Sequence, residues 1–490
     1  MNIQINFKFS LTISVDEVIG LICLNLIFNE LRTNLKSIYS CLFVNKAWCH
    51  LIVPILWERY TYFINDEKSK KIIFNIILSC LPTSSKQLLF DNDITLFKTT
   101  LSKSPTFNYI SLFNFPKVEI INGIINMVFG KKNLGNYLSK RNLLEREICK
   151  SFISECKSIE ELDWRINQPL TSFPGALTRF SQLFNLTVDL HFVSSNSLHE
   201  MAQICRDLNK LNVDNYFQDV PGLISLIDAQ RNLKFVLFKF SFNIKKEIYE
   251  GLSNALAKKD TINSLILRGS VGVISHSFLT SLNNLKYLTI HYECENCEAI
   301  KELQKWLGNS KFPDLQSLDI GNDLLCFKEL AMSIEKTKGN IFDITAYTSN
   351  KSAENTGKLL KAISIHCPKI DYLNYKSWTS LLMNCRNLVC LFLHSLNKND
   401  DIGDELLNIL TKFSPESLTE IKVSGYWKYS IDTFENFFKS YKGRESLHFD
   451  IIDDYDGEHI TIGHINIVYK YYIEGIILCS NLLNYVRLKA

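Results

Sequence analysis

The chain has 490 residues, enough for about three domains at a typical size of roughly 150 residues each. Hydrophobic residues make up 46% of it and charged residues 21%, which excludes an intrinsically disordered chain and favours a folded protein with a sizeable core. The 54 basic and 51 acidic residues leave a formal charge of +3, so the composition does not favour nucleic acid or a membrane surface as the partner.

Fourteen cysteines are spread between Cys23 and Cys479, mostly inside apolar runs. This distribution predicts reduced, buried thiols, and we expect an intracellular protein of the cytoplasm or nucleus. The most apolar late stretch, 465–478, contains Lys470 and Glu474 and falls short of the roughly 18 uninterrupted apolar residues of a membrane span. We therefore expect no membrane-spanning segment.

The N-terminal sixty residues contain three predicted helices. Apolar residues at helical spacing mark them: Leu24, Ile27, Phe28 and Leu31 in the first, Ile38, Cys41 and Leu42 in the second, and Val44, Trp48 and Leu51 in the third. The third helix is expected to stop before Pro54, because the residue before a proline avoids helical backbone angles. A bundle of about 45 residues is marginally stable alone, so apolar side chains left on its surface suggest a partner.

Residues 59–105 are predicted to form a helical connector. The apolar run from Ile72 to Leu81 has helical character and is stopped by Pro82. This composition is too apolar for a free linker, so we expect the connector to pack against the repeats that follow.

A pattern of three apolar residues, at its first, fourth and sixth positions, recurs along the rest of the chain. The copies are Ile159/Leu162/Trp164, Leu183/Leu186/Val188, Leu208/Leu211/Val213, Leu233/Val236/Phe238, Ile262/Leu265/Leu267, Leu285/Leu288/Ile290, Leu315/Leu318/Ile320, Ile341/Ile344/Ala346, Ile370/Leu373/Tyr375, Leu388/Leu391/Leu393 and Leu418/Ile421/Val423. Their first positions advance by 18 to 30 residues, about 26 on average, which matches the roughly 20 to 29 residues of a leucine-rich repeat. An earlier copy at Phe107, Ile110 and Leu112 extends the predicted array to residues 106–455.

Each copy predicts a short strand, and helix-compatible segments lie between the strands. These segments are Leu198 to Leu208, Ile248 to Ala257, Ile300 to Leu307 and Glu405 to Phe413. Stacked strand–helix units would form an α/β solenoid with parallel strands on its concave face and a helical cap within residues 456–490, near Ile465 to Val486. The position that often carries Asn or Cys holds Asn167 but also His191 and Tyr216, which predicts an irregular horseshoe without a continuous Asn ladder.

Three runs within the N-terminal bundle match a known motif in order and spacing. They are Cys23-Leu-x-x-Ile-Phe-x-x-Leu31, Tyr39-Ser-Cys-Leu-Phe-Val-Asn-Lys-Ala-Trp48-Cys49 and Val53-Pro-Ile-Leu-Trp57. Together with the terminal Leu-Trp, they resemble an F-box over residues 13–58, and a leucine-rich array is a partner domain that many F-box proteins carry. The family usually opens this motif with Leu-Pro, where this chain has Ile19-Gly20.

The resemblance implies a substrate receptor of a cullin-type ubiquitin ligase. Its F-box would dock a Skp-family adaptor, and through it a cullin, while the repeats bind a protein substrate. The adaptor-binding positions that it implies are Leu24, Ile27, Phe28, Leu31, Leu42, Val44, Trp48 and Trp57. The alternative is that these side chains only pack inside the bundle, and that the chain is a non-catalytic leucine-rich-repeat scaffold with a degenerate F-box.

The sequence contains no complete motif for catalysis or metal binding among those considered by spacing. The chain has no phosphate-binding Gly-x-x-x-x-Gly-Lys-Ser/Thr loop and no His-Glu-x-x-His pair. The Cys294-x-x-Cys297 pair next to His291 has no second ligand pair at a supporting distance, and the acidic run 450–458 lacks the spacing of a calcium loop. We therefore predict a protein that is not an enzyme and that uses no metal or cofactor.

The predicted substrate surface lies on the concave face of the central repeats, where outward side chains alternate with buried ones. Phe235, Ile266 and Tyr287 would form a hydrophobic anchor, and Lys239, Arg268 and His291 a basic rim. Such a surface suits a protein segment with acidic or phosphorylated residues. The alternative is that isolated apolar residues on this face have no binding role.

Overall fold

The computed structural model of the chain describes residues 15–31, 34–57, 67–96, 105, 107–130, 138–156, 158–241, 248–270, 272–293, 297–321, 327–346, 356–370, 372–374, 388–395, 403–425, 428–452 and 460–484. It divides into two compact units, residues 1–182 and residues 183–490, which are described separately.

The first unit begins with the three predicted helices, α1 (Val15–Glu30), α2 (Leu35–Cys41) and α3 (Lys46–Trp57). The side chains of Asn34 and Asn45 accept hydrogen bonds from the backbone N–H groups of Ser37 and Trp48, which sets the start of α2 and α3. Phe28, Ile38, Ile52, Ile55 and Leu56 form the buried core of this bundle.

The prediction that α3 stops before Pro54 is wrong, because the helix continues through Pro54 to Trp57. A proline inside a helix removes one backbone hydrogen bond and costs about 3 kcal/mol or more. Continuing the helix places Ile55 and Leu56 in the buried core, and burial of two such side chains returns a comparable free energy, about 1.5–3 kcal/mol each.

The rest of the first unit is largely helical. Its elements are α4 (Glu67–Cys80), α5 (Thr83–Asp91), η3 (Tyr109–Leu112), α6 (Val118–Phe129), α7 (Leu138–Glu155), β1 (Glu161–Trp164), η5 (Leu170–Ser172) and α8 (Ala176–Phe180). The expected connector helix is α4, which ends just before Pro82 as predicted, and Pro82 then begins α5.

The expected first repeat strand at Phe107, Ile110 and Leu112 is not a strand. Tyr109–Leu112 is a 3₁₀ helix whose start is fixed by the Asn108 side chain, which accepts a hydrogen bond from the N–H of Ser111. The three-residue step from Phe107 to Ile110 also fits a helical turn, so spacing alone could not tell a strand from a helix here.

The second unit is a repeat solenoid of parallel strands and helices. Its strands are β2 (Asn185–Asp189), β3 (Lys210–Tyr216), β4 (Phe235–Phe240), β5 (Ser264–Ser270), β6 (Tyr287–Glu293), β7 (Ser317–Gly321), β8 (Asp343–Ala346), β9 (Tyr372–Asn374), β10 (Cys390–Ser395), β11 (Glu420–Gly425), β12 (Leu447–Ile452) and β13 (Ile477–Cys479). Its helices are α9 (Ser195–Ile204), α10 (Pro221–Ala229), α11 (Gly251–Ala257), η6 (Ser277–Ser281), α12 (Cys297–Asn309), α13 (Phe327–Ile334), α14 (Thr356–His366), α16 (Gly403–Phe413), α17 (Ile431–Ser440) and α18 (Ile462–Ile473).

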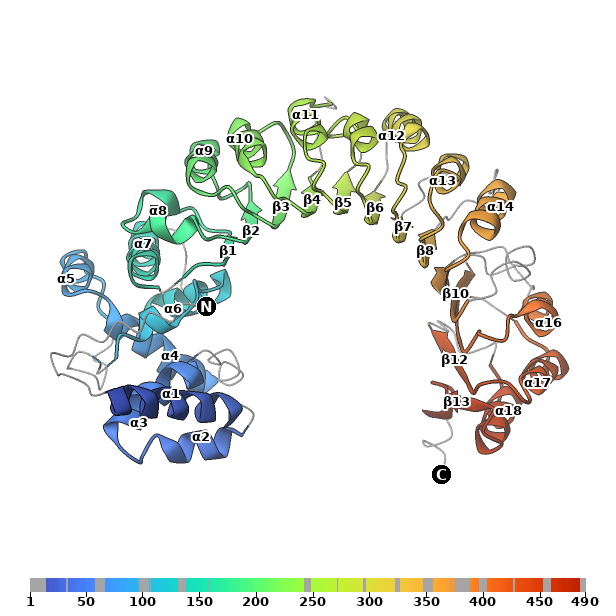
Figure 1. Cartoon of the computed structure of the whole chain (residues 1–490), viewed down its shortest axis with the longest axis horizontal. Coiled ribbons are helices and arrows are strands. Elements are labelled where there is room, and N and C mark those ends of the chain that lie inside the picture. Colours follow the sequence, from blue (N-terminus) through green and yellow to red (C-terminus); the bar gives the residue numbers. More distant parts are fainter. Residues whose placement is uncertain are drawn as a thin grey trace. The chain divides into compact units, whose positions relative to one another are not determined.

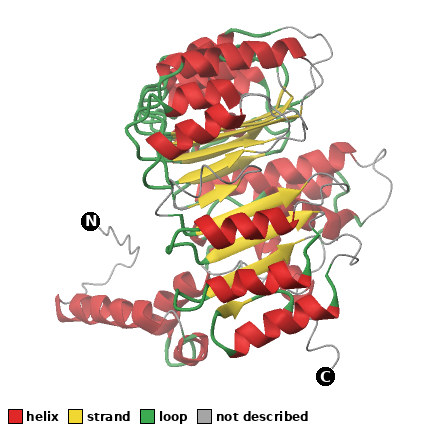
Figure 2. Ribbon diagram, turned by 90° about the vertical axis from the view of Figure 1, so that its right-hand side faces the viewer, coloured by secondary structure: helices red, strands yellow, loops and turns green. Residues whose placement is uncertain are grey.

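Neighbouring strands of this unit pair in parallel and in chain order. They line its inner side, and the helices lie along the outer side (Figure 1). Viewed from the side, the helices cover one face of the sheet (Figure 2). The register places equivalent apolar positions opposite one another, as in Leu211–Val236 and Leu265–Leu288, so each repeat closes the core of the next.

The eleven predicted copies from Ile159 to Leu418 fall on strands β1 to β11, with Tyr375 of the ninth copy outside the described residues, and the first position of each copy is buried. The four helix-compatible segments correspond to α9, α11, α12 and α16. Strand β12 lies within the predicted array, and the region of the expected helical cap contains the helix α18 followed by a further strand, β13. The apolar pattern misses β12 and β13 because Arg444 and Glu474 stand where these copies would need their first apolar residues.

Hydrogen bonds from different side-chain types, here Gln230 and Asp219, connect neighbouring repeats. In regular repeats an Asn ladder makes these connections. The buried amide of Gln230 accepts from the N–H of Leu208 at 2.9 Å and donates to the carbonyl oxygen of Cys205 at 2.9 Å. The Asp219 carboxylate accepts from the N–H groups of Gly251 and Leu252, which begin α11, at 2.7 and 3.1 Å.

Within the described parts of the chain, no single helix has the length and apolar composition of a membrane span. Only α4 and α5 taken together pass that test, across a bend of 101°.

Candidate interaction surfaces

The predicted adaptor-binding residues fall into three groups by exposure. Ile27 on α1 and Val44 in the turn before α3 are exposed. Five residues are partly buried: Leu24, Leu31, Leu42, Trp48 and Trp57. Phe28 is 1% exposed and packs edge-on against the Trp48 ring at 5.1 Å, so any role of Phe28 in adaptor binding is indirect, through the position of α1.

Sequence reasoning missed the most exposed apolar side chains of this bundle. Phe43 is 87% exposed in the turn between α2 and α3, next to Val44, and Ile22 and Leu26 are exposed on α1 beside Ile27. The sequence does carry a signal for them, because these apolar residues lie outside the apolar stripe that packs into the core and so have no packing role in the bundle. We call Ile22, Leu26, Ile27, Phe43 and Val44 the bundle patch.

An apolar groove lies beside the bundle, within the first unit. It has a volume of about 330 Å³ and is lined by Tyr39, Leu42, Val53 and Trp57 together with Ile72 of α4. The indole Nε1 of Trp57 is buried and has no hydrogen-bond partner within the described ranges. The indole N–H of Trp57, a residue that lines this groove, is therefore a buried donor without an acceptor among the described residues.

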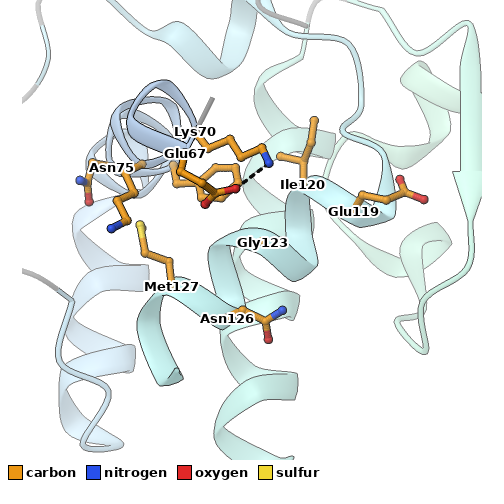
Figure 3. A pocket seen from close by; sticks show the side chains of 10 residues that line it. Glu67, Lys70, Asn75, Glu119, Ile120, Gly123, Asn126 and Met127 are labelled. Atoms are coloured by element: carbon orange, nitrogen blue, oxygen red, sulfur yellow. Dashed lines mark hydrogen bonds and ion pairs between the residues drawn. The ribbon is translucent and has the colours of Figure 1, made fainter. Parts of the chain in front are cut away.

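A larger cavity of about 680 Å³ lies between α4 and α6 (Figure 3). Its floor includes Phe74 and Gly123, where a Cβ on Gly123 would come within 2.6 Å of the Phe74 ring. At its rim Lys70 and Glu67 form an ion pair at 2.8 Å. This rim is already charge-balanced, and we assign no ligand to the cavity.

The predicted substrate residues do lie together on the strand side of the second unit. The register aligns Phe235, Ser264 and Tyr287 in one row, Leu237, Ile266 and Thr289 in the next, and Lys239, Arg268 and His291 in a third. Tyr287 is exposed, whereas Phe235 and Ile266 are half-buried. We call these rows the inner sheet face.

The basic rim is more nearly neutral than the sequence suggested. Lys239 pairs with Asp214 at 2.9 Å, and the His291 ring lies 2.8 Å from the Asp319 carboxylate. Arg268 is exposed, and none of the side chains described pairs with it. Lys239 and His291 are thus paired with carboxylates, and Arg268 is the predicted cation whose charged group is available to a ligand.

A buried polar network lies behind the inner sheet face. His276 is fully buried, with Nε2 at 2.9 Å from the Tyr292 hydroxyl and Nδ1 at 2.7 Å from Glu302. Burial opposes ionisation of the Glu302 carboxyl, but its hydrogen bonds to His276 and the charge of His276 outweigh that effect and lower its pKa. Burial raises the pKa of Tyr292 well above its ordinary value, so this phenol stays protonated and serves as a structural tie.

Only one cysteine of the Cys294-x-x-Cys297 pair lies within the described residues. Cys294 lies outside the described residues, and Cys297 begins α12. In the portions of the chain that the structure covers, no group of three His, Cys, Asp or Glu side chains has the arrangement of a metal site.

No protein-family model matches the chain, and no curated protein matches it. Among solved structures, it is similar to the leucine-rich repeat-containing protein LegL7 from Legionella pneumophila, with 15% identity, a TM-score of 0.34 and coverage of 64% of this chain and 96% of that one. It is also similar to a chain of the Rad7 and Elc1 complex in yeast, with 15% identity, a TM-score of 0.29 and coverage of 64% and 89%. A third is the Leptospira interrogans LRR protein LIC12759, with 13% identity, a TM-score of 0.30 and coverage of 62% and 85%.

The repeat architecture follows from the strand register of the chain itself: parallel strands in chain order, joined by helices, with the predicted apolar positions buried. The second unit therefore has the solenoid fold of a leucine-rich-repeat protein, in which the stacked strands form one extended face.

Proposed function

We propose that the chain is the substrate-recognition subunit of a cullin-type ubiquitin ligase. In this proposal the N-terminal bundle is an F-box that docks a Skp-family adaptor, which links it to a cullin, and the inner sheet face binds the protein substrate. The chain contributes binding surfaces and no bond chemistry of its own.

The observation that carries the proposal is the bundle patch. Five large apolar side chains stay exposed on a three-helix unit that already has a buried core of its own. Exposed apolar groups gathered on one small module mark a protein interface, and helix-in-groove recognition uses anchors at helical spacing. The patch lies on the same helices that carry the F-box resemblance.

The alternative is a scaffold whose bundle binds no adaptor. It is favoured by Gly20, which stands where the motif usually has proline and has no atom of the described residues within 4 Å of the position where its Cβ would be.

A direct binding measurement separates the two. The purified full chain would be titrated with a Skp-family adaptor by calorimetry, beside the variant Phe43→Asp, Val44→Asp. Loss of exposed apolar anchors is expected to weaken binding by about 2 kcal/mol or more, roughly thirtyfold. Leu177→Asp on α8, which is similarly exposed, is the matched control and should bind like the parent. No heat of binding from the parent would leave the scaffold as the better account.

A further inference from the structure

The last helix of the solenoid, α18, carries two apolar stripes. One of them packs on α17, where the His464 ring lies 4.9 Å from Phe434 and the Tyr471 ring 5.8 Å from Phe438. The other stripe runs through Ile462, Tyr469, Tyr472 and Ile473, which are all exposed. Helix α17 has helices packed on both of its sides, α16 and α18, so α18 has the surface of an inner repeat helix.

Among the described residues, strand β13 has one unpaired edge. It pairs with β12 on one side, and the sheet order ends with it. Leu478 on this strand is 65% exposed, close to the 66% of Ile473 on α18. The N–H of Ile476 donates to the carbonyl oxygen of Tyr471 at 2.9 Å, which joins the end of the helix to the start of the strand. We call Ile462, Tyr469, Tyr472, Ile473 and Leu478 the terminal patch.

A terminal repeat of a soluble solenoid normally has a polar outer side, because no neighbour covers it. Among the described residues, the charged side chains of this helix end are paired. Lys470 pairs with Glu435 at 2.7 Å, and Glu474 lies 3.6 Å from Lys442, so both charges are matched by partners on α17 and in the turn that follows it. The five side chains of the terminal patch carry no charge of their own.

The size of the patch fits a dimer interface. At about 150–250 Å² for each large side chain, these exposed fractions leave on the order of 500 Å² of apolar surface. This is more than half of the roughly 800 Å² that each partner contributes to a standard protein interface.

We propose that the terminal patch is covered by the terminal patch of a second copy of this chain. An occupant must offer an apolar helix stripe next to a free strand edge, and the end of the same solenoid offers both. A two-fold axis would place α18 against α18 and pair the two β13 edges antiparallel, which closes the assembly and removes the exposed edges. An uncharged patch lets two identical surfaces meet without repulsion. This dimer is independent of the proposed function, because it uses neither the bundle patch nor the inner sheet face.

Light scattering coupled to size-exclusion chromatography tests the proposal on the full chain. Between about 1 and 50 μM the parent should show a dimer whose fraction rises with concentration. The variant Ile473→Asp, Leu478→Asp should be monomeric, with the dimer Kd raised about tenfold or more. Ile365→Asp on α14 is the matched control, since Ile365 is similarly exposed far along the chain from this end, and it should stay dimeric.

A crosslinking measurement keeps the test sharp if the double variant folds poorly. Cys479 is exposed on β13, and Cys23 is exposed on α1. A short bismaleimide should join two chains of the parent and of Cys23→Ser, but not of Cys479→Ser. A parent that is monomeric at every concentration would overturn the proposal and leave residues 485–490 or another protein as the cover. A dimer that survives the double variant, or that crosslinks without Cys479, would overturn it equally.

Discussion

The imidazole of His464 binds two backbone groups at once, and the carbonyl oxygen of Tyr429, 35 residues earlier in the chain, is one of them. Nε2 of His464 lies 3.0 Å from the Tyr429 oxygen, and Nδ1 accepts from the N–H of Thr461 at 3.0 Å. Because Nδ1 is an acceptor, Nε2 must carry the proton, so this geometry needs the neutral ring. His464 therefore caps α18 and ties it to the preceding repeat only in one protonation state.

The first prediction concerns the pH dependence of this end of the solenoid. Burial lowers the pKa of His464 more than the Tyr429 carbonyl and the Asp404 charge raise it. A folded pKa below the unfolded value means that stability is fully present above about pH 6.5 and is lost as the pH falls through the folded pKa. As the pH falls from about 7 to 5, hydrogen exchange of α18 amides should therefore become faster relative to exchange of α9 amides. In His464→Gln, whose amide does not titrate, this difference should not change with pH.

The second prediction concerns Pro54 in the middle of α3. Pro54→Ala restores a backbone N–H inside the helix while Ile55 and Leu56 stay in the core, and it should stabilise the bundle by about 1–3 kcal/mol. Hydrogen exchange of α1 and α3 amides reports this directly. Val53→Ala, which changes the neighbouring partly buried side chain without adding a donor, should not slow exchange. A faster exchange in Pro54→Ala would show that the proline ring packs favourably where it is.

The third prediction concerns Asp219, which accepts hydrogen bonds from the N–H groups of Gly251 and Leu252 and from the Tyr216 hydroxyl at 2.6 Å. Asp219→Ala leaves these donors without a partner and should lower the free energy of unfolding by about 1–3 kcal/mol. Asp219→Asn keeps one acceptor oxygen and should lose less. Urea denaturation followed by circular dichroism measures both, and Asp207→Ala, at an exposed position, should change it by less than about 0.5 kcal/mol.

The fourth prediction concerns the inner sheet face. If Arg268 and its apolar neighbours contact the substrate, the triple variant Phe235→Ala, Arg268→Glu, Tyr287→Ala should lose partners in a proximity-labelling map while the adaptor signal is unchanged. Lys305→Glu on the helix side reverses a charge elsewhere and should leave the map as it is. An unchanged partner list for a folded triple variant would place substrate binding on another surface.

The repeats were predictable because their apolar positions are dictated by a local rule that every unit obeys. Leu211, Val236 and Leu265 occupy the same position in successive strands, and each is buried for the same reason. The rule fails where a charged residue occupies an apolar position, as Arg444 does before β12. It also fails where a helix and a strand share the same spacing, as at Ile110.

The site residues were less predictable, because their state depends on partners from other repeats. Lys239 and His291 look like free cations in the sequence, but Asp214 and Asp319 from neighbouring strands neutralise them. Val44 looks like the start of the third helix, but α3 begins at Lys46 and leaves Val44 and its neighbour Phe43 in an exposed turn. Such outcomes follow from packing in three dimensions, which spacing along the chain does not report.

Assembly in solution is the decisive measurement for the proposed role of this chain as the link between a substrate and a cullin ligase. The purified chain, a Skp-family adaptor and a cullin would be mixed at about 10 μM and analysed by size-exclusion chromatography with light scattering. The proposed function predicts a single complex with one adaptor and one cullin for each copy of the chain, and this complex should be lost in the variant Phe43→Asp, Val44→Asp. Elution of the chain free of adaptor, with the same profile for parent and variant, would contradict it.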